Sequence, residues 1–105
     1  MALIAVVGSA TGVMWADLTP ARAADGAVQV NDEAFTPPEI TVAPGTTVTW
    51  QNTGTAPHSA KGKDGSFDTG YVMPGAQGQF TFSSPGDFAY FCEPHPYKTG
   101  VVHVK

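Results

Sequence analysis

From Asp25 onward the chain consists of short runs in which apolar and polar residues alternate, and this period of two constrains the fold more than any other feature. In a β-strand, successive side chains point to opposite faces, so each run predicts a half-buried strand. Pro-Gly pairs and other turn signals separate the runs, and no helical periodicity of useful length appears among them. The predicted strands are residues 27–31, 39–42, 46–52, 78–82, 87–92 and 101–104.

Six or seven short strands with turns at regular spacing predict an all-β domain, a two-sheet antiparallel β-sandwich. One face of each strand supplies the core, which is modest for a domain of this size, so a bound metal would add useful stability. The residues expected to face inward are Val28, Val30, Ile40, Val42, Val48, Trp50, Phe80, Phe82, Phe88, Tyr90, Val102 and Val104.

The N-terminal segment differs from the rest of the 105-residue chain. Residues 2–15 are uncharged and largely apolar, but as a helix they would reach only about 21 Å, short of a bilayer core of about 30 Å. Ala21-Arg22-Ala23 then offers a small-x-small cleavage pattern. We therefore expect residues 1–23 to be a signal peptide or membrane anchor and residues 24–105 to be a periplasmic or extracytoplasmic domain. A buried helix is the alternative, since no Lys or Arg precedes the apolar run.

The charge balance limits the partners. Nine acidic residues against five basic ones give a net charge of −4, with no basic cluster. This excess argues against binding to nucleic acid or to anionic lipid, so we expect membrane contact only through an uncleaved N-terminal segment. It is compatible with a basic protein partner, and equally with a surface that is acidic for solubility alone.

Cys92 is the only cysteine, so it cannot form an internal disulfide. The run Cys92-Glu93-Pro94-His95 places a histidine three residues later in a proline-stiffened loop, and His58 follows Pro57 in a second loop. A free thiol in an oxidising compartment should be buried or metal-bound. One thiolate and two imidazoles fit a trigonal copper site with a weak axial fourth ligand. The alternatives are a merely buried Cys92 and a loop His58 without a ligand role.

The segment from Tyr90 to Tyr97, together with Pro57-His58, resembles the cupredoxins, and within them the amicyanin and pseudoazurin-like group with its short Cys-x-x-His-x-x-Met loop. The resemblance covers nearly all of residues 24–105, including the turns at Pro44-Gly45, Pro74-Gly75 and Pro85-Gly86. It implies a Greek-key sandwich with one type 1 copper ion near one end. It also implies one-electron transfer between redox protein partners, by a monomer that is not an enzyme. The implied ligands are His58, Cys92 and His95.

His95 is the ligand that we expect to be exposed, with its imidazole edge as the exit for the electron. Pro94, Pro96 and Tyr97 surround it, and we expect them to form an apolar docking surface together with Pro57 and Met73. Stiffening of the loop is a further role of the prolines. His103 alternates with valines and should face outward, away from the site.

Two residues depart from the pattern of the family. Ser59 stands where an asparagine often braces the cysteine loop, and with Pro57 it should lie just behind the ligands. Lys98 stands at the usual position of the axial methionine. Deprotonating a lysine at neutral pH costs about 4–5 kcal/mol, so we expect Lys98 not to be a ligand and its head to lie in solvent.

The axial position would then be empty or filled by water or the Pro57 carbonyl, with Met73 a remote alternative. An ammonium beside the metal should raise the reduction potential, so Lys98→Met should lower it. Lys98 could also be a change that impairs the site.

The residues leave other functions open. A copper-binding or delivery protein without redox cycling is the main alternative, since a missing axial ligand leaves an open coordination position. A metal-free adhesion-like sandwich is another. Copper oxidases and nitrite reductases of this fold need further domains and histidine-rich sites, whereas this chain has three histidines. A nucleophilic-cysteine hydrolase needs an orienting third group, which the Cys92 loop lacks.

Overall fold

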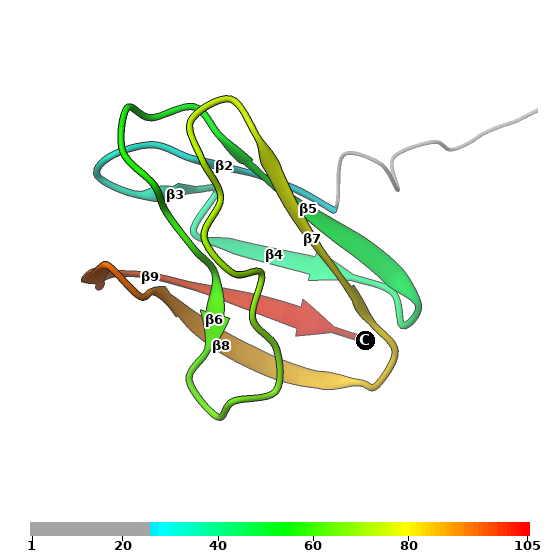
Figure 1. The fold of residues 1–105 in the computed structure, drawn as a ribbon. Coiled ribbons are helices and arrows are strands. Elements are labelled where there is room, and N and C mark those ends of the chain that lie inside the picture. Colours follow the sequence, from blue (N-terminus) through cyan, green and yellow to red (C-terminus); the bar gives the residue numbers. More distant parts are fainter. Residues whose placement is uncertain (1–25) are drawn as a thin grey trace, which may run out of the picture.

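The structure, a computed structural model, describes residues 26–105, and every regular element in that range is a strand (Figure 1). No helix in this range is long and apolar enough to cross a membrane. The predicted signal or anchor segment, residues 1–23, lies outside the described residues and stays a prediction. The strands are β2 (Ala27–Val30), β3 (Phe35–Thr36), β4 (Glu39–Val42), β5 (Thr46–Asn52), β6 (Lys61–Gly62), β7 (Gln77–Phe82), β8 (Gly86–Cys92) and β9 (His95–Val104).

The strands form two four-stranded sheets that pack as a sandwich, with strand orders β3-β2-β5-β7 and β4-β9-β8-β6 (Figure 1). The predicted all-β sandwich is confirmed, but the sheets are mixed rather than wholly antiparallel. β2 runs parallel to β5, and β4 runs parallel to β9. The chain crosses to the second sheet for β4 and returns for β5, so β2 and β5 share a sheet without a hairpin between them.

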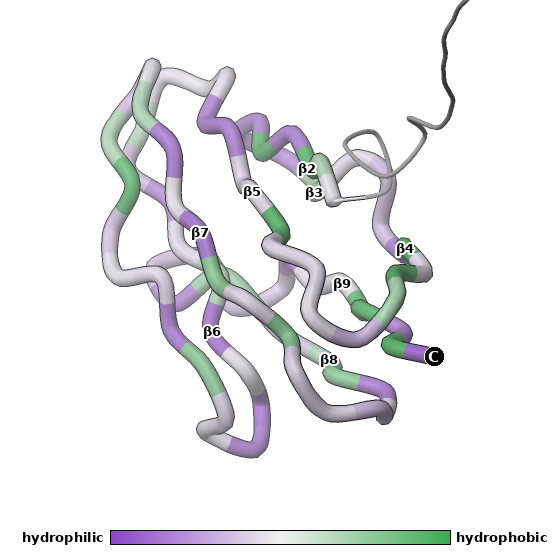
Figure 2. The backbone as a smooth tube through the Cα atoms, turned by 90° about the vertical axis from the view of Figure 1, so that its right-hand side faces the viewer, coloured by the Kyte–Doolittle hydropathy of each residue, from purple (hydrophilic) through white to green (hydrophobic). Residues whose placement is uncertain are grey.

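The apolar residues of the alternating runs are buried in the core, and Figure 2 shows hydrophobic residues in green interspersed with more hydrophilic ones along the chain. Ten of the twelve residues predicted to face inward are buried, and Phe80 and Phe88 pack against them while partly buried. Trp50 lies at the centre, stacked on Phe67 with ring centroids 5.7 Å apart and edge-on to Tyr90 at 5.5 Å. Burying a large apolar side chain contributes roughly 1.5–3 kcal/mol, so this aromatic cluster is a major source of stability.

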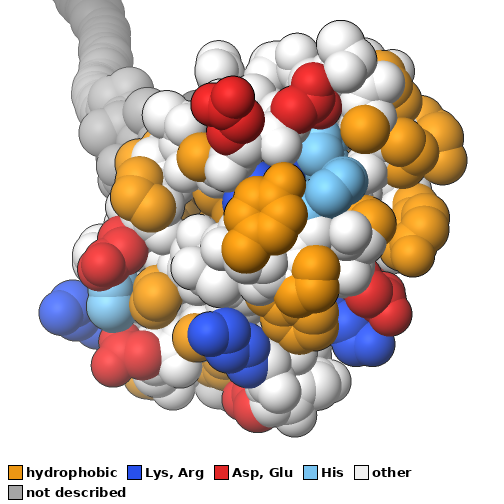
Figure 3. Space-filling view, turned by 90° about the vertical axis from the view of Figure 1, so that its left-hand side faces the viewer, with side chains coloured by type: hydrophobic (Ala, Val, Ile, Leu, Met, Phe, Trp, Pro, Cys, Tyr) orange, Lys and Arg blue, Asp and Glu red, His pale blue; other side chains and the backbone are white. Residues whose placement is uncertain are grey.

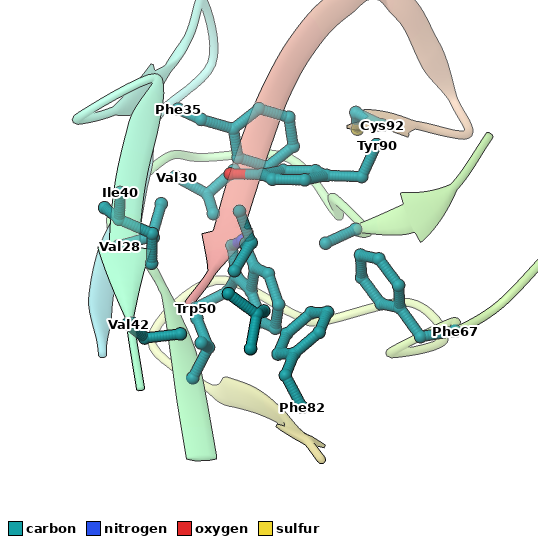
Figure 4. Packing of buried hydrophobic residues seen from close by; sticks show 14 residues of the cluster. Val28, Val30, Phe35, Ile40, Val42, Trp50, Phe67, Phe82, Tyr90 and Cys92 are labelled. Atoms are coloured by element: carbon teal, nitrogen blue, oxygen red, sulfur yellow. The ribbon is translucent and has the colours of Figure 1, made fainter. Parts of the chain in front are cut away.

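The buried residues of strand β8 extend the hydrophobic core to one end of the sandwich. Tyr90 and Cys92 are both fully buried, two residues apart on the inner face, and Cys92 lies beside Tyr90 at the edge of the cluster (Figure 4). Phe35 and Phe67 complete the cluster, although they lie outside the alternating runs of the sequence. The cysteine is therefore held by the rigid interior.

Candidate metal centre

The structure brings Cys92, His58 and His95 together. One donor atom from each, the Cys92 Sγ and two histidine ring nitrogens, lies within 4.8 Å of the others. The Sγ atom is 3.6 Å from Nδ1 of His58 and 3.6 Å from Nδ1 of His95. Two imidazole nitrogens thus converge on one sulfur at one end of the sandwich.

Two segments from different parts of the fold supply these donors. Cys92 ends β8 and His95 begins β9, so the turn between the two strands carries both residues. His58 lies in the connection between β5 and β6, where its backbone N–H donates to the carbonyl of Val72 at 3.1 Å and its carbonyl accepts from the Val72 N–H at 2.6 Å. Backbone hydrogen bonds therefore fix the second segment against a neighbouring loop.

Asn52 links the segment that carries His58 to the loop that contains Val72. No motif in the sequence indicated this role. The buried side chain of Asn52 donates to the carbonyls of Ala56 at 2.9 Å and Val72 at 2.8 Å, and accepts from the N–H of Gly54 at 2.8 Å. The three bonds link both ends of the segment that leads to the histidine. Asn52 therefore helps to set the position of His58.

Asp32 orients the ring of His58, and sequence reasoning missed it. Its Oδ1 atom lies 2.9 Å from Nε2 of His58, so Nε2 carries the proton and Nδ1 keeps its lone pair for the site. Burial lowers the pKa of His58, which favours the neutral ring that a metal needs. Hydrogen bonds from the Thr55 hydroxyl and from His58 hold the pKa of the Asp32 carboxyl well below its usual range.

Ser59 lies behind the cysteine, in the position expected for it. Its backbone N–H donates to Cys92 Sγ at 3.4 Å, and its hydroxyl accepts from the N–H of Glu93 at 2.9 Å. The first bond sets a donor against the sulfur, and the second ties the two ligand-bearing segments together. The serine thus braces the cysteine turn despite its short side chain. Pro57, on the other side of His58, is exposed.

The prediction that the head of Lys98 lies in solvent is wrong. Only 2% of the residue is exposed. Its Nζ atom lies 2.8 Å from Nδ1 of His58 and donates to the carbonyl of Asn31 at 2.7 Å, with the ring of Phe35 centred 5.5 Å away. Burial lowers the pKa of Lys98, whereas the Cys92 thiolate and the Asp32 carboxylate raise it.

A bulge turns the lysine inward. The β8–β9 register pairs Phe91 with Thr99 but Cys92 with His95, so the intervening residues of β9 are displaced. A β-bulge bends its strand and re-aims side chains, and here it directs Lys98 to the same side as the cysteine. The lysine therefore points into the interior, where its Nζ atom lies beside Nδ1 of His58.

His103 and Met73 lie apart from the converging donor atoms. His103 is outside the cluster, with its side chain 27% exposed between Asp87 and Glu39. Met73 is 51% exposed, at the surface. Neither residue belongs to the group of donor atoms that converge in the described part of the chain.

An apolar surface surrounds the one partly exposed donor residue, His95. Tyr97 is 71% exposed, and Pro57, Pro94 and Pro96 are also exposed. Figure 3 shows this end of the molecule, where histidine atoms in pale blue reach the surface beside hydrophobic side chains in orange. Tyr71 and Met73, on either side of the Val72 that bridges to His58, are also more than half exposed.

The chemistry of the donors decides which metal they fit. A thiolate with two imidazoles, and no carboxylate among the converging donors, is typical of copper electron-transfer centres. The buried thiol already accepts a hydrogen bond, and both imidazoles point a ring nitrogen at it. These residues fit a copper ion.

Comparison with known proteins identifies the family to which the fold belongs. A family model described as a cupredoxin-like domain matches residues 2–104. This chain belongs to the cupredoxin-like family. The cupredoxin resemblance of the cysteine loop is thereby confirmed. Among relatives of this cupredoxin, amicyanin-alpha of Methylorubrum extorquens is 32% identical over 83 residues, which cover 74% of the chain and 70% of the relative.

Amicyanin of Paracoccus versutus is 36% identical over 83 residues, covering 74% of this cupredoxin and 63% of the relative. A solved amicyanin variant in its oxidised state, described as carrying lysine in place of methionine, has a TM-score of 0.69 and 31% identity, with 75% of this chain and 80% of that one covered. A purple cupredoxin from Nitrosopumilus maritimus shares the fold at a TM-score of 0.71 and 24% identity, covering 77% of this chain and 100% of its own.

Proposed function

We propose that this cupredoxin is a small exported copper protein that carries single electrons between redox protein partners. The observation that carries the proposal is the convergence of the Cys92 sulfur and the ring nitrogens of His58 and His95 within 4.8 Å. The ion would cycle between Cu(II) and Cu(I), since thiolate and imidazole bind both states. Solved amicyanins described as oxidised and as Cu(I) forms support this cycle.

The protein's own residues keep the site unchanged while the electron moves. Asp32 holds the ring of His58, and Ser59 holds both the sulfur and the turn that follows it. The core packs behind Cys92, which is fully buried. Because these contacts do not involve the ion, the donors need little rearrangement when its charge changes, and the free-energy cost of electron exchange stays small.

The electron would leave through His95. This residue is partly exposed, whereas Cys92 and His58 are buried. The apolar surface of Pro94, Pro96 and Tyr97 around it would exclude water when a partner docks, which shortens the path between the two redox centres. Apolar contact with a polar rim is the usual character of a transient interface core.

The proposal extends to where the protein acts and to its oligomeric state. Residues 1–23 would serve as the signal or anchor for a periplasmic or extracytoplasmic destination, and the domain would act as a monomer without enzymatic activity of its own. The relatives that this chain matches are amicyanins, which supports a role as an electron carrier and not as an enzyme.

A specific observation favours a second candidate, a copper-binding or delivery protein without redox cycling. Lys98 donates to the same nitrogen of His58 that a metal would use. A side chain that competes for a ligand would make bound copper easier to release. Transfer of Cu(I) to a metal-free acceptor, without rapid electron exchange, would support this candidate.

The visible absorption spectrum of the Cu(II)-loaded chain tests the proposal. An intense thiolate-to-copper charge-transfer band that is absent in Cys92→Ser and retained in His103→Gln would support the type 1 site. Only a weak d–d band, or rapid bleaching with oxidation of the thiol, would count against electron transfer and favour copper handling. The His103 variant is a matched control, because that histidine lies outside the cluster.

A further inference from the structure

The large apolar side chains that are exposed in the described part of the chain lie close to the segments that carry the metal donors. They are Tyr71, Met73 and Tyr97, each more than half exposed. Tyr97 follows His95 by two residues, whereas the other two flank Val72, whose backbone pairs with that of His58. Exposed apolar side chains that gather at one place mark a surface for another macromolecule. The charges at the edge of this surface indicate which partner it fits.

The loop of residues 31–34, between β2 and β3, borders the apolar surface without supplying a metal donor. Oδ1 of Asp32 accepts hydrogen bonds from the N–H groups of Thr55 and Ala56 at 2.9 and 3.2 Å. Those two residues directly precede Pro57, one of the exposed prolines at this end. The loop is therefore fixed at one edge of the apolar surface.

Two carboxylates belong to this loop. Glu33 is exposed, and the side chain of Asp32 is 43% exposed. Oδ1 of Asn31 accepts from the backbone N–H groups of Glu33 and Ala34, both at 2.8 Å, which gives the loop a defined turn. Figure 3 shows acidic side chains in red beside histidine atoms in pale blue at this end of the molecule. The backbone that carries Glu33 thus has a fixed place beside the apolar surface.

No exposed lysine of residues 26–105 offsets these two carboxylates. Lys61 does lie toward this end, but its Nζ atom is 3.6 Å from a carboxylate oxygen of Glu93. Lys63 lies further away, since its backbone N–H donates to the carbonyl of Ala89 near the middle of β8. Lys105 follows the far end of β9. The loop therefore gives one edge of the surface an unbalanced negative charge.

We infer that the loop of residues 31–34 orients a redox protein partner whose own surface around its redox centre is basic. The inference rests on the proposed function and names the kind of partner. Opposite charges at the rim of an interface speed the encounter and suppress wrong orientations, while apolar contacts form its centre. A basic partner would place its lysines over this loop and its redox group over His95.

The experiment uses two probes that differ only in charge: cytochrome c, a basic protein, and the same cytochrome with its lysines succinylated, which makes it acidic. The first readout needs no copper. Isotope-labelled, metal-free chain is titrated with each cytochrome by NMR at an ionic strength of about 10 mM, where charges act over about 30 Å. We expect the native cytochrome to bind at least about tenfold more tightly, with shifts of amide signals in residues 31–34 and 94–97. The difference should vanish at about 1 M salt, where the screening length is about 3 Å.

Matched variants separate the loop from the overall charge. Glu33→Lys reverses a charge in the loop, and Asp87→Lys makes the same change in net charge at the opposite end of β8 from Cys92. Binding of the native cytochrome should weaken at least about fivefold more in Glu33→Lys than in Asp87→Lys, and Glu33→Gln should show a smaller loss in the same direction. Equal losses in the two lysine variants would overturn the inference, because overall charge alone would then attract the partner. Tighter binding of the succinylated cytochrome would overturn it as well.

Failure of the proposed function has a different signature. With copper bound, the ferric cytochrome takes one electron from the Cu(I)-loaded chain, which becomes the Cu(II)-loaded chain, and this rate should fall in Glu33→Lys. If the native cytochrome binds as expected but no electron passes in either direction, the proposed electron transfer is refuted and the basic partner surface stands. If electrons pass at equal rates with both cytochromes and in both lysine variants, only the inference is refuted.

Discussion

Replacing Asn52 by alanine should destabilise the domain and loosen the loop that carries His58. The buried side chain makes three hydrogen bonds of 2.8–2.9 Å. After its removal the Val72 carbonyl keeps a partner in the N–H of His58, but the Ala56 carbonyl and the Gly54 N–H lose the partner that Asn52 supplies. At about 1 kcal/mol for each hydrogen bond, with an added cost for unpaired groups, we expect a loss of about 2–4 kcal/mol.

The assay is urea unfolding of the metal-free chain, with Cu(I) affinity measured on the same samples. Asn52→Asp keeps the side-chain volume but replaces the donating NH2 group by a carboxylate oxygen. That oxygen would face the carbonyl oxygens of Ala56 and Val72, so this variant should cost at least as much stability as Asn52→Ala. Gln51→Ala is the matched control. This neighbour is half-buried, and its bonds to the backbone are 3.3 and 3.4 Å long. The 2.7 Å bond that it accepts from the Gln77 amide is exposed to water, so we expect a loss below about 1 kcal/mol. Equal losses for the two alanine variants would refute the reasoning.

Three other changes test the site and its scaffold. Ser59→Ala removes the acceptor of the Glu93 N–H and should cost about 1 kcal/mol in urea unfolding and speed Cu(I) dissociation; an unchanged dissociation rate would contradict the bracing role. Carboxylate partners raise the pKa of His103, so its stabilisation is present at acidic pH and is lost as pH rises through the raised value. His103→Gln should therefore lower Tm more at pH 5.5 than at pH 9, and the opposite order would count against this linkage. In Gly100→Ala the new Cβ would meet the ring and hydroxyl of Tyr90, costing about 1–3 kcal/mol in urea, and a neutral result would show that this ring can move.

Features that are local in sequence were predictable. The strands follow from alternation, and most core residues follow from the strands. The three donors follow from Cys92-x-x-His95 and from a histidine at the end of a loop, because residue type and spacing carry that signal. Phe35 and Phe67 were missed because each reaches the core from a segment without alternation.

Features that depend on contacts between distant segments were not predictable. Asp32 meets His58 from 26 residues away in sequence, and no motif marks such a pair. The sequence showed that Lys98 was unusual but not where its head lies. That depends on a bulge in β9 and on the carbonyl of Asn31, 67 residues away in sequence, which offers the ammonium a partner inside the protein.

The parallel pairing of β4 with β9 bears on how the protein acquires its metal. β9 carries both His95 and Lys98, and it lies between β4 and β8 in its sheet. Its register sets Val101 opposite Glu39, so a long stretch of chain must close into a loop before the strand is in place. Proteins dominated by such non-local contacts fold slowly, in milliseconds to seconds. The complete set of donors would therefore form late in folding, and an ion present during refolding would be captured mainly by molecules whose sheets are already paired.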